Sequence, residues 1–136
     1  MRAVLLTLVL TALATGCGGA DDARERDATA TGPRLDPPAD LTWQTTAAEY
    51  RGEIGATVTV DCPAQGEVGS LWGTDPYTDD SSICTAGVHA GAITVEDGGE
   101  VTIRIADGET SYDGGEANGV TAADWPDWPG SFTVVR

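Results

Sequence analysis

The sequence predicts a small α+β domain in which one buried helix is enclosed by β-sheet. Short runs in which apolar and polar residues alternate, as is typical of strands, are separated by turns rich in Gly and Asp. Residues 79–93 alone carry helix signals, and their apolar side chains leave little polar face, which indicates a buried helix. The chain of 136 residues is long enough for one domain with one core.

The first 16 residues are typical of a signal peptide. Arg2 supplies a positive charge, and "AVLLTLVLTALA" at 3–14 supplies an apolar segment that is too short to span a bilayer. "ATGC" at 14–17 resembles a lipobox, which makes Cys17 the predicted lipidation site and the first residue of the mature chain. Two or three acyl chains would anchor it stably to a membrane. Ordinary secretion with a spare thiol at Cys17 is the alternative.

Residues 17–40 are predicted to be the lipidated Cys17 and a flexible acidic linker to a domain at 41–136. After Cys17 the segment has no aromatic residue and almost no large aliphatic one. Such a segment cannot bury enough apolar surface to offset the entropy of ordering. The composition changes at 41–43, "LTW", where the domain is expected to begin.

Three strands are expected in the domain, "ATVTVDC" at 56–62, "EVTIRIA" at 100–106 and "SFTVVR" at 131–136. Each alternates between apolar and polar residues, so one face of each should be buried. The residues expected to face inward are Val58, Val60, Val101, Ile103, Ile105, Phe132 and Val134. "EDGGE" at 96–100, between "AITV" and "VTIRI", predicts a hairpin turn because a Gly pair tolerates positive φ.

The helix expected over 79–93 begins with "DDSS", whose side-chain oxygens can accept hydrogen bonds from the first-turn N–H groups. Gly91 suits the helix stop. His89 is expected to be a packed residue whose ring nitrogens bond to backbone or to a nearby polar side chain, with ligand contact as the alternative. Ser82 and His89 lie roughly 10 Å apart along the helix axis, too far for a nucleophile and its base.

The charge excludes one class of partner. All seven basic residues are Arg, against 22 Asp and Glu, and the formal net charge is −15. Nucleic-acid binding needs a basic face, so no nucleic-acid partner is expected. An anionic membrane would likewise repel the domain unless lipid or a divalent cation helps.

Carboxylates near the helix start are the candidate metal ligands. Asp75, Asp79 and Asp80 could place oxygen atoms around a weakly bound Ca²⁺. Their spacing is not that of an EF-hand loop. Helix capping and solubility are the alternative explanation. One His and two Cys besides Cys17 cannot complete a zinc site with four ligands, so no other cofactor is expected.

Tryptophans near the C-terminus are the candidate sugar contacts. Trp125 and Trp128 flank Pro126 in "DWPDWPG". The C–H face of a sugar packs on an exposed indole ring, and Trp125 is the ring expected to be exposed. Trp72 and Tyr77 lead into the helix and are expected to be packing residues.

A longer pattern resembles a known family. "LWGTDPYTDDSSICTAGVHAG" at 71–91, then "GGEVTIRI", "SYDGGEANGV" and "WPGSFTV", is similar to the LCCL domain over about residues 50–135. The resemblance implies a central helix enclosed by two antiparallel β-sheets and an extracellular, non-catalytic module. Some family members are thought to bind lipopolysaccharide or other microbial surface polysaccharide. Trp128 falls in the family signature and is expected in the core, while Asn118 in "NGV" joins His89 and Trp125 as a candidate ligand contact.

The resemblance also bears on the cysteines. Animal members of the family typically have two disulfides, and Cys62 and Cys84 match one half of each. The two cysteines should still be close in such a fold, so the resemblance implies a Cys62–Cys84 disulfide. Two free buried thiols are the alternative. The family often has a basic residue where Ala117 stands here, so capture of lipid A phosphates is not expected.

Together these features predict a bacterial cell-surface lipoprotein in the cell envelope, on the extracytoplasmic side of a membrane. The expected role is binding or adhesion to an envelope polysaccharide, a glycolipid or a protein. A structural or accessory subunit that docks a protein partner through an apolar patch is the second hypothesis. A hydrolase is the remote third, because no nucleophile and base can be paired.

Overall fold

The computed structural model describes residues 32–136, so the predicted signal peptide and Cys17 lie outside the described residues. In chain order the elements are β1 (Arg34–Leu35), the 3-10 helix η1 (Ala48–Tyr50), β2 (Thr57–Cys62), β3 (Tyr77–Thr78), α2 (Ile83–His89), β4 (Gly99–Tyr112), β5 (Gly115–Ala117), β6 (Val120–Ala122) and β7 (Trp125–Val134). Strands predominate over helix, which confirms a mixed α+β domain with one α-helix among the described residues.

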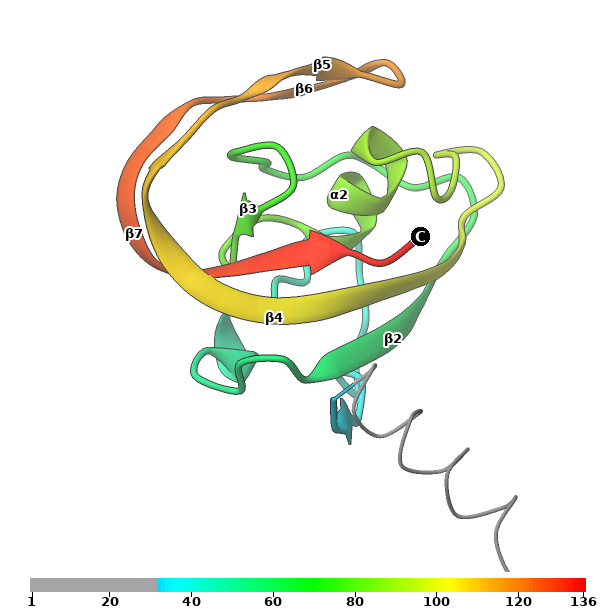
Figure 1. Ribbon diagram of the computed structural model, residues 1–136. Coiled ribbons are helices and arrows are strands. Elements are labelled where there is room, and N and C mark those ends of the chain that lie inside the picture. The colour runs from blue at the N-terminus through cyan, green and yellow to red at the C-terminus, as the bar shows by residue number, and fades with distance from the viewer. Residues whose placement is uncertain (1–31) are drawn as a thin grey trace, which may run out of the picture.

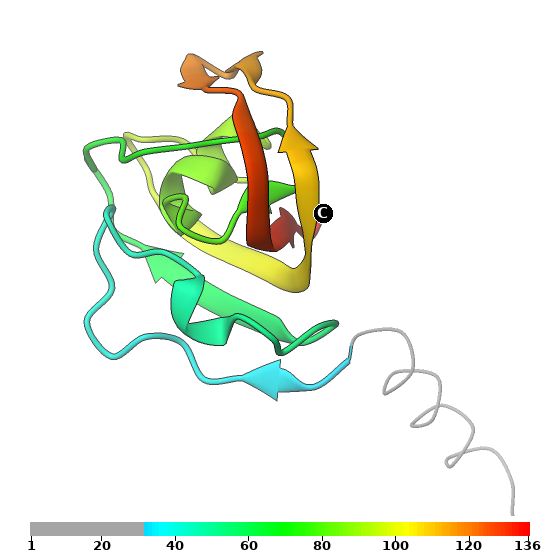
Figure 2. The same cartoon turned by 90° about the vertical axis from the view of Figure 1, so that its left-hand side faces the viewer.

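The strands form two sheets. The larger has the order β1-β2-β4-β7-β3, and β5 pairs with β6 in the smaller. β5 and β6 lie between β4 and β7 in the chain, so the four strands make one long hairpin that curves around α2 (Figures 1 and 2). The larger sheet is mixed rather than antiparallel, because β1 pairs with β2 in parallel.

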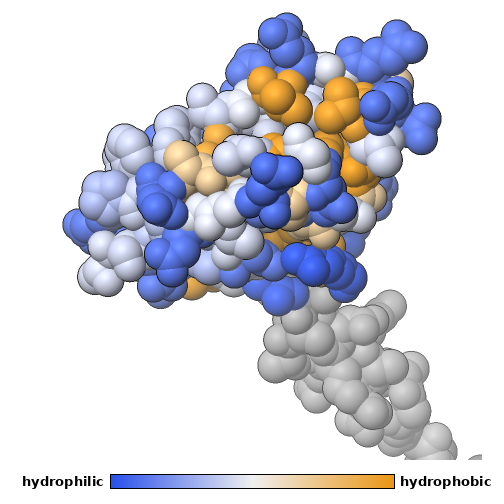
Figure 3. Space-filling view, turned by 90° about the horizontal axis from the view of Figure 1, so that it is seen from above, coloured by the Kyte–Doolittle hydropathy of each residue, from blue (hydrophilic) through white to orange (hydrophobic). Residues whose placement is uncertain are grey.

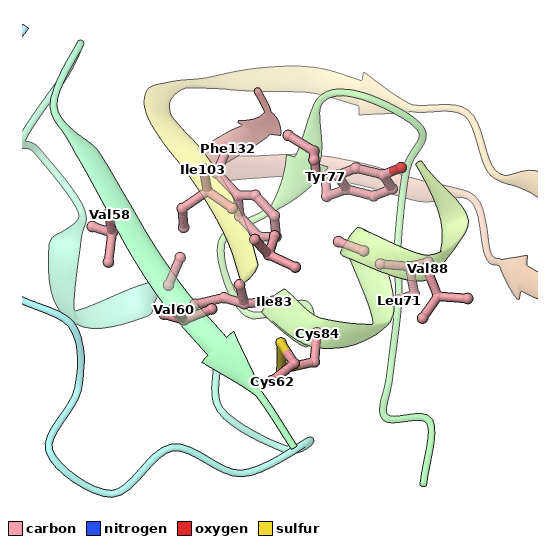
Figure 4. Close-up of a cluster of buried hydrophobic side chains, with 14 of the residues drawn as sticks. Val58, Val60, Cys62, Leu71, Tyr77, Ile83, Cys84, Val88, Ile103 and Phe132 are labelled. Atoms are coloured by element: carbon pink, nitrogen blue, oxygen red, sulfur yellow. A yellow bond between two sulfur atoms is a disulfide. The ribbon is translucent and has the colours of Figure 1, made fainter. Parts of the chain in front are cut away.

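The two central strands follow the predicted alternation. Val58 and Val60 of β2 pair with Ile103 and Val101 of β4, and all four side chains are buried. β4 continues to Tyr112, well beyond the predicted strand. The buried side chains of these two strands pack in one core with those of α2 (Figure 4).

The predicted hairpin between 92–95 and the strand after it is wrong. Gly98 and Gly99 do have positive φ, but residues 92–95 contribute only an isolated bridge between Thr94 and Gly98. The reason is that β4 takes its partner from earlier in the chain, with Gly99 opposite Cys62. Residues 92–95 instead form part of a loop beside the helix end.

The strand predicted at 131–136 is the second half of β7. Pairing with β4 begins already at Trp125, opposite Tyr112. Pro126 and Pro129 argue against a strand from sequence, since proline cannot donate to the ladder. β7 keeps one register with β4 on both sides of Pro129, which itself has no partner in the pairing.

The helix is shorter than the predicted 79–93. It begins after Ser82, whose Oγ accepts a hydrogen bond from the Thr85 N–H, and Gly91 follows its end with a φ of 82°. All seven residues of α2 are buried. A Cβ on Gly87 would lie 2.5 Å from a Val101 methyl group, so glycine allows the helix to approach β4 closely.

A disulfide joins the end of β2 to α2. Cys62 and Cys84 are bonded, with their Cα atoms 5.8 Å apart, and both lie in the hydrophobic core (Figure 4). The pairing that the resemblance implied is confirmed. It links the sheet directly to the helix that the sheet encloses.

The predicted linker is ordered at its C-terminal end. Arg34–Leu35 form β1, and the carbonyl of Asp36 accepts a hydrogen bond from the hydroxyl of Tyr50. Leu35, one of the few aliphatic residues in the predicted linker, packs against the core. Residues 35 and 36 therefore contact the domain that is expected to begin at 41.

Candidate ligand-binding surfaces

His89 is a structural residue at the end of α2. It is 3% exposed. Its Nε2 lies 2.9 Å from the carbonyl oxygen of Gly115, which can only accept, so Nε2 carries the proton. Its Nδ1 lies 2.9 Å from the hydroxyl oxygen of Tyr77. The expected bonding of His89 to backbone and a polar side chain is confirmed, and burial raises the pKa of Tyr77 to about 12.

Neither Ser82 nor the neighbouring Ser81 is placed to act with His89. The Ser82 hydroxyl donates to the carbonyl of Trp43 at 2.6 Å. The Ser81 hydroxyl lies 2.9 Å from that of Thr78. Both serines are buried, and their hydroxyls hold loops against the start of α2. The described residues therefore give no support to the hydrolase hypothesis.

Asn118 ties the β5–β6 hairpin to the helix end. Its side-chain N–H donates to the carbonyl of His89 at 2.9 Å, which satisfies one of the free carbonyls of the last turn. The φ of Asn118 is 51°, a conformation that asparagine adopts more readily than most residues. Gly91 lies against this amide, because a Cβ there would be 3.3 Å from the Asn118 nitrogen. Asn118 thus forms part of a wall at the end of α2.

That wall bounds a groove of about 370 Å³, which we call the helix-end groove. Its lining residues are Val68, Val88, Gly91, Ile93, Thr94, Val95, Glu96, Asn118, Gly119 and Val120. Five of them are branched aliphatic residues, and the polar ones come from the loop after α2 and from the turn between β5 and β6. Figure 3 views the molecule from above, which is the side on which β5 and β6 lie. Apolar residues are gathered among hydrophilic ones on this face.

A second surface is built around Asp79. This carboxylate is 1% exposed and accepts two hydrogen bonds from Arg51, at 2.6 and 2.7 Å. It also accepts one from the indole N–H of Trp128, at 2.8 Å. Burial alone would raise the pKa of Asp79, but the bonds from Arg51 and Trp128 outweigh it, and the pKa lies below its usual value. Asp79 is therefore held as a carboxylate.

Three indole rings lie side by side next to this ion pair, and we call them the tryptophan cluster. The ring centre of Trp125 is 5.4 Å from that of Trp72 and 6.3 Å from that of Trp128. The guanidinium carbon of Arg51 lies 5.6 Å from the centre of the Trp128 ring. All three rings are half-buried. The core position expected for Trp128 is wrong, because its N–H bonds to Asp79 and its ring packs in this cluster.

The structure does not bring the predicted calcium ligands together. Asp79 is occupied by Arg51, and Asp75 accepts hydrogen bonds from Arg136 and from the backbone N–H of Val134. Within residues 32–136, no group of three or more His, Cys, Asp or Glu side chains is placed to hold a metal ion. Asp75 and Asp79 thus serve as partners for arginine and backbone, whereas one carboxylate oxygen of Asp80 is buried without a hydrogen-bond partner.

Comparison with known proteins identifies the module. A family model described as the LCCL domain matches residues 41–132, which is more than half of the chain. The chain belongs to the LCCL domain family. Human vitrin is 38% identical over 79 residues, which cover 57% of this chain and 12% of vitrin. Guinea pig cochlin is 37% identical over 75 residues, which cover 55% of the chain and 13% of cochlin.

Clotting factor C of Tachypleus tridentatus is 30% identical over 88 residues, which cover 63% of the chain but 8% of that protein. The match to each of these relatives thus spans about an eighth of its length or less. The shared part is the LCCL domain, a module of extracellular proteins. No helix within the described residues has the length and apolar character needed to cross a membrane.

The sequence alone missed two parts of these surfaces. Arg51 is separated from Asp79 by 28 positions, and no local pattern joins them. The sequence predicts that Ile93 and Val95 lie in a strand, but in the structure they line the helix-end groove. For the groove, the one sequence signal was Asn118 in "NGV", which the LCCL resemblance made a candidate ligand contact.

Proposed function

We propose that this LCCL domain is the binding module of a bacterial cell-surface lipoprotein, and that its ligand is an envelope polysaccharide or glycolipid. The tryptophan cluster carries this proposal. Trp72, Trp125 and Trp128 form a half-buried aromatic surface whose geometry is fixed by packing and by the bond from Trp128 to Asp79. Rings held in this way stack on a sugar without a large cost in side-chain entropy.

The charge of the domain favours a ligand without many phosphates. The formal net charge of the chain is −15, and Arg51 and Arg136 are both bonded to aspartates. A phosphate-rich lipid would meet repulsion here. A neutral glycan would not, and the guanidinium edge of Arg51, which is 41% exposed, offers donors for sugar hydroxyls beside Trp128.

The proposed role is non-catalytic. His89 is the one histidine of the chain, and both of its ring nitrogens are bonded to structural partners. The hydroxyls of Ser81 and Ser82 are also engaged inside the fold. His89 is thus a buried base, and the serine hydroxyls are out of its reach. Both observations support binding rather than catalysis.

Lipidation at Cys17 would hold the module at the membrane. Labelling cells with an alkyne fatty acid tests this part of the proposal. The full chain should take up the label and fractionate with membranes, whereas Cys17→Ser should do neither. An unlabelled full chain that is released into the medium would mean ordinary secretion.

A pelleting assay tests the ligand class. A secreted chain that keeps residues 17–136 and carries Cys17→Ser would be mixed with purified cell-wall polysaccharide and with lipopolysaccharide, each with Ca²⁺ and with a chelator. We expect pelleting with polysaccharide and its loss in Trp125→Ala. Pelleting with neither material would overturn the glycan proposal. Dependence on Ca²⁺ would mean that carboxylates bridge to the glycan through the ion.

A further inference from the structure

The helix-end groove shares no residue with the tryptophan cluster, so a ligand there is independent of the glycan proposal. We propose that this groove binds a short segment of a partner protein that carries a branched aliphatic side chain next to a basic residue. The apolar lining, the acidic rim and the hydrogen bonds that hold the groove in shape all favour such a segment.

One large apolar side chain of the lining is exposed to solvent. Val68 is 49% exposed, and among the described residues Ile54 is the one other large apolar residue exposed to a similar extent. Ile93 and Val95 are partly buried and pack against the core. Covering these side chains with an aliphatic group removes apolar surface from water, which is favourable. A volume of about 370 Å³ is at the lower end for ligand sites, so it suits a short segment.

The rim of the groove is acidic and has no cation. Glu96 is a lining residue, and the exposed residues Glu67 and Asp97 are next to lining residues in the chain. No Arg lines the groove, and the chain has no Lys. An apolar surface with uncompensated carboxylates complements an aliphatic side chain with a neighbouring Lys or Arg. An anionic lipid would meet repulsion at the same rim.

The groove is held in shape by hydrogen bonds. Asn118 donates to the carbonyl of His89, and His89 donates to the carbonyl of Gly115, so the β5–β6 hairpin is tied to α2 at two points. Because Nδ2 of Asn118 is used in this way, its side-chain oxygen is the group left to accept from a peptide N–H. A wall that is already ordered lowers the entropic cost of binding.

Three acetylated pentapeptide amides test the proposal. Their sequences are Gly-Lys-Leu-Lys-Gly, Gly-Glu-Leu-Glu-Gly and Gly-Lys-Ser-Lys-Gly, and each is titrated into the ¹⁵N-labelled chain of residues 17–136 with Cys17→Ser. We expect the first peptide to shift the amide signals of residues 91–96 and 118–120. The second and third should bind at least about tenfold more weakly, since each lacks one of the two features.

Three variants assign the site. Val68→Ser should weaken binding of the Lys-Leu-Lys peptide about tenfold, whereas Ile54→Ser, at an equally exposed apolar position outside the groove, should not. Glu96→Lys should transfer the preference to the Glu-Leu-Glu peptide. If Val68→Ser fails to fold, Glu96→Lys still decides, because Glu96 is exposed.

Several results would overturn the proposal. One is the absence of shifts at residues 91–96 and 118–120 with any of the peptides. Equal binding of the acidic and basic peptides would remove the charge argument. Tighter binding of sodium decanoate than of any peptide would identify the groove as a site for acyl chains instead.

Discussion

The carboxylate of Asp79 holds the guanidinium of Arg51 by two hydrogen bonds, one to each carboxylate oxygen, at 2.6 and 2.7 Å. The same buried carboxylate accepts the indole N–H of Trp128, and Arg51 lies over the ring of Trp128. One aspartate just before α2 therefore fixes a cation and an aromatic ring at the surface. The testable consequences begin with this carboxylate.

Replacing Asp79 with Asn should destabilise the domain in a pH-dependent way. The pKa of Asp79 lies below its usual value, so its ionised form stabilises the folded state. That stabilisation is present above the unfolded-state carboxyl pKa of about 4 and is lost as the pH falls through the lower folded-state pKa. Urea unfolding at pH 7 should show a loss of about 2 kcal/mol for Asp79→Asn, and the two proteins should converge in acid.

The exposed Asp127 provides the control for this measurement. Asp127→Asn should change the free energy of unfolding at pH 7 by less than about 0.5 kcal/mol. A loss for Asp79→Asn that is no larger than this would mean that the ion pair has no structural role.

Gly130 is needed next to the same carboxylate. A Cβ at this position would lie 1.9 Å from Oδ2 of Asp79, so Gly130→Ala must displace the carboxylate from Arg51. We expect a lower melting temperature and a shift of the Trp128 indole signal in ¹H–¹⁵N spectra. Gly115→Ala is the matched control, because its Cβ would meet only a Thr74 oxygen at 3.9 Å. Equal effects of the two substitutions would contradict the steric argument.

Removing the disulfide should cost about 3 kcal/mol of unfolding free energy, as expected for a loop of this length. Cys62 and Cys84 are 22 positions apart and lie in the core. The double variant Cys62→Ser and Cys84→Ser removes the disulfide. Urea unfolding with and without a reductant gives the comparison. Reductant should weaken the parent chain and leave the double variant unchanged. A parent chain that is insensitive to reductant after unfolding and refolding would show that no disulfide forms.

The tyrosines should titrate at unusually high pH. Burial raises the pKa of Tyr50 and of Tyr77 to about 12, and it also raises the pKa of Tyr112. Absorbance at 295 nm should therefore show little ionisation at pH 10 in the folded protein. Because the folded-state pKa values are raised, stability should fall as the pH rises from about 10, the unfolded value. A titration midpoint at pH 10 in the folded protein would contradict the burial of these rings.

Much of the fold was predictable because local signals and tertiary packing agree. The alternation in 56–62 and 100–106, an N-cap within "DDSS" at 79–82 and the stop at Gly91 all correspond to what the structure shows. The family signature added what local signals lack, namely the two sheets around the helix and the pairing of Cys62 with Cys84.

The rest depends on contacts between distant segments. Residues 92–95 have a strand pattern, yet β4 pairs with β2 instead, and the loop becomes a wall of the helix-end groove. Asp79 and Trp128 are 49 positions apart, so no spacing rule could connect them. The position of Trp128 was therefore misjudged, although the residue itself was singled out.

The most direct test of the proposed function follows the indole N–H signals during a titration with oligosaccharides from the cell wall. The chain has four tryptophans, and Trp43 provides an internal reference because its N–H is bonded to the carbonyl of Pro63, outside the cluster. We predict that the Trp125 signal shifts with saturation while the Trp43 signal does not move. If oligosaccharides leave the signals of Trp72, Trp125 and Trp128 unchanged, the tryptophan cluster is not a glycan-binding surface.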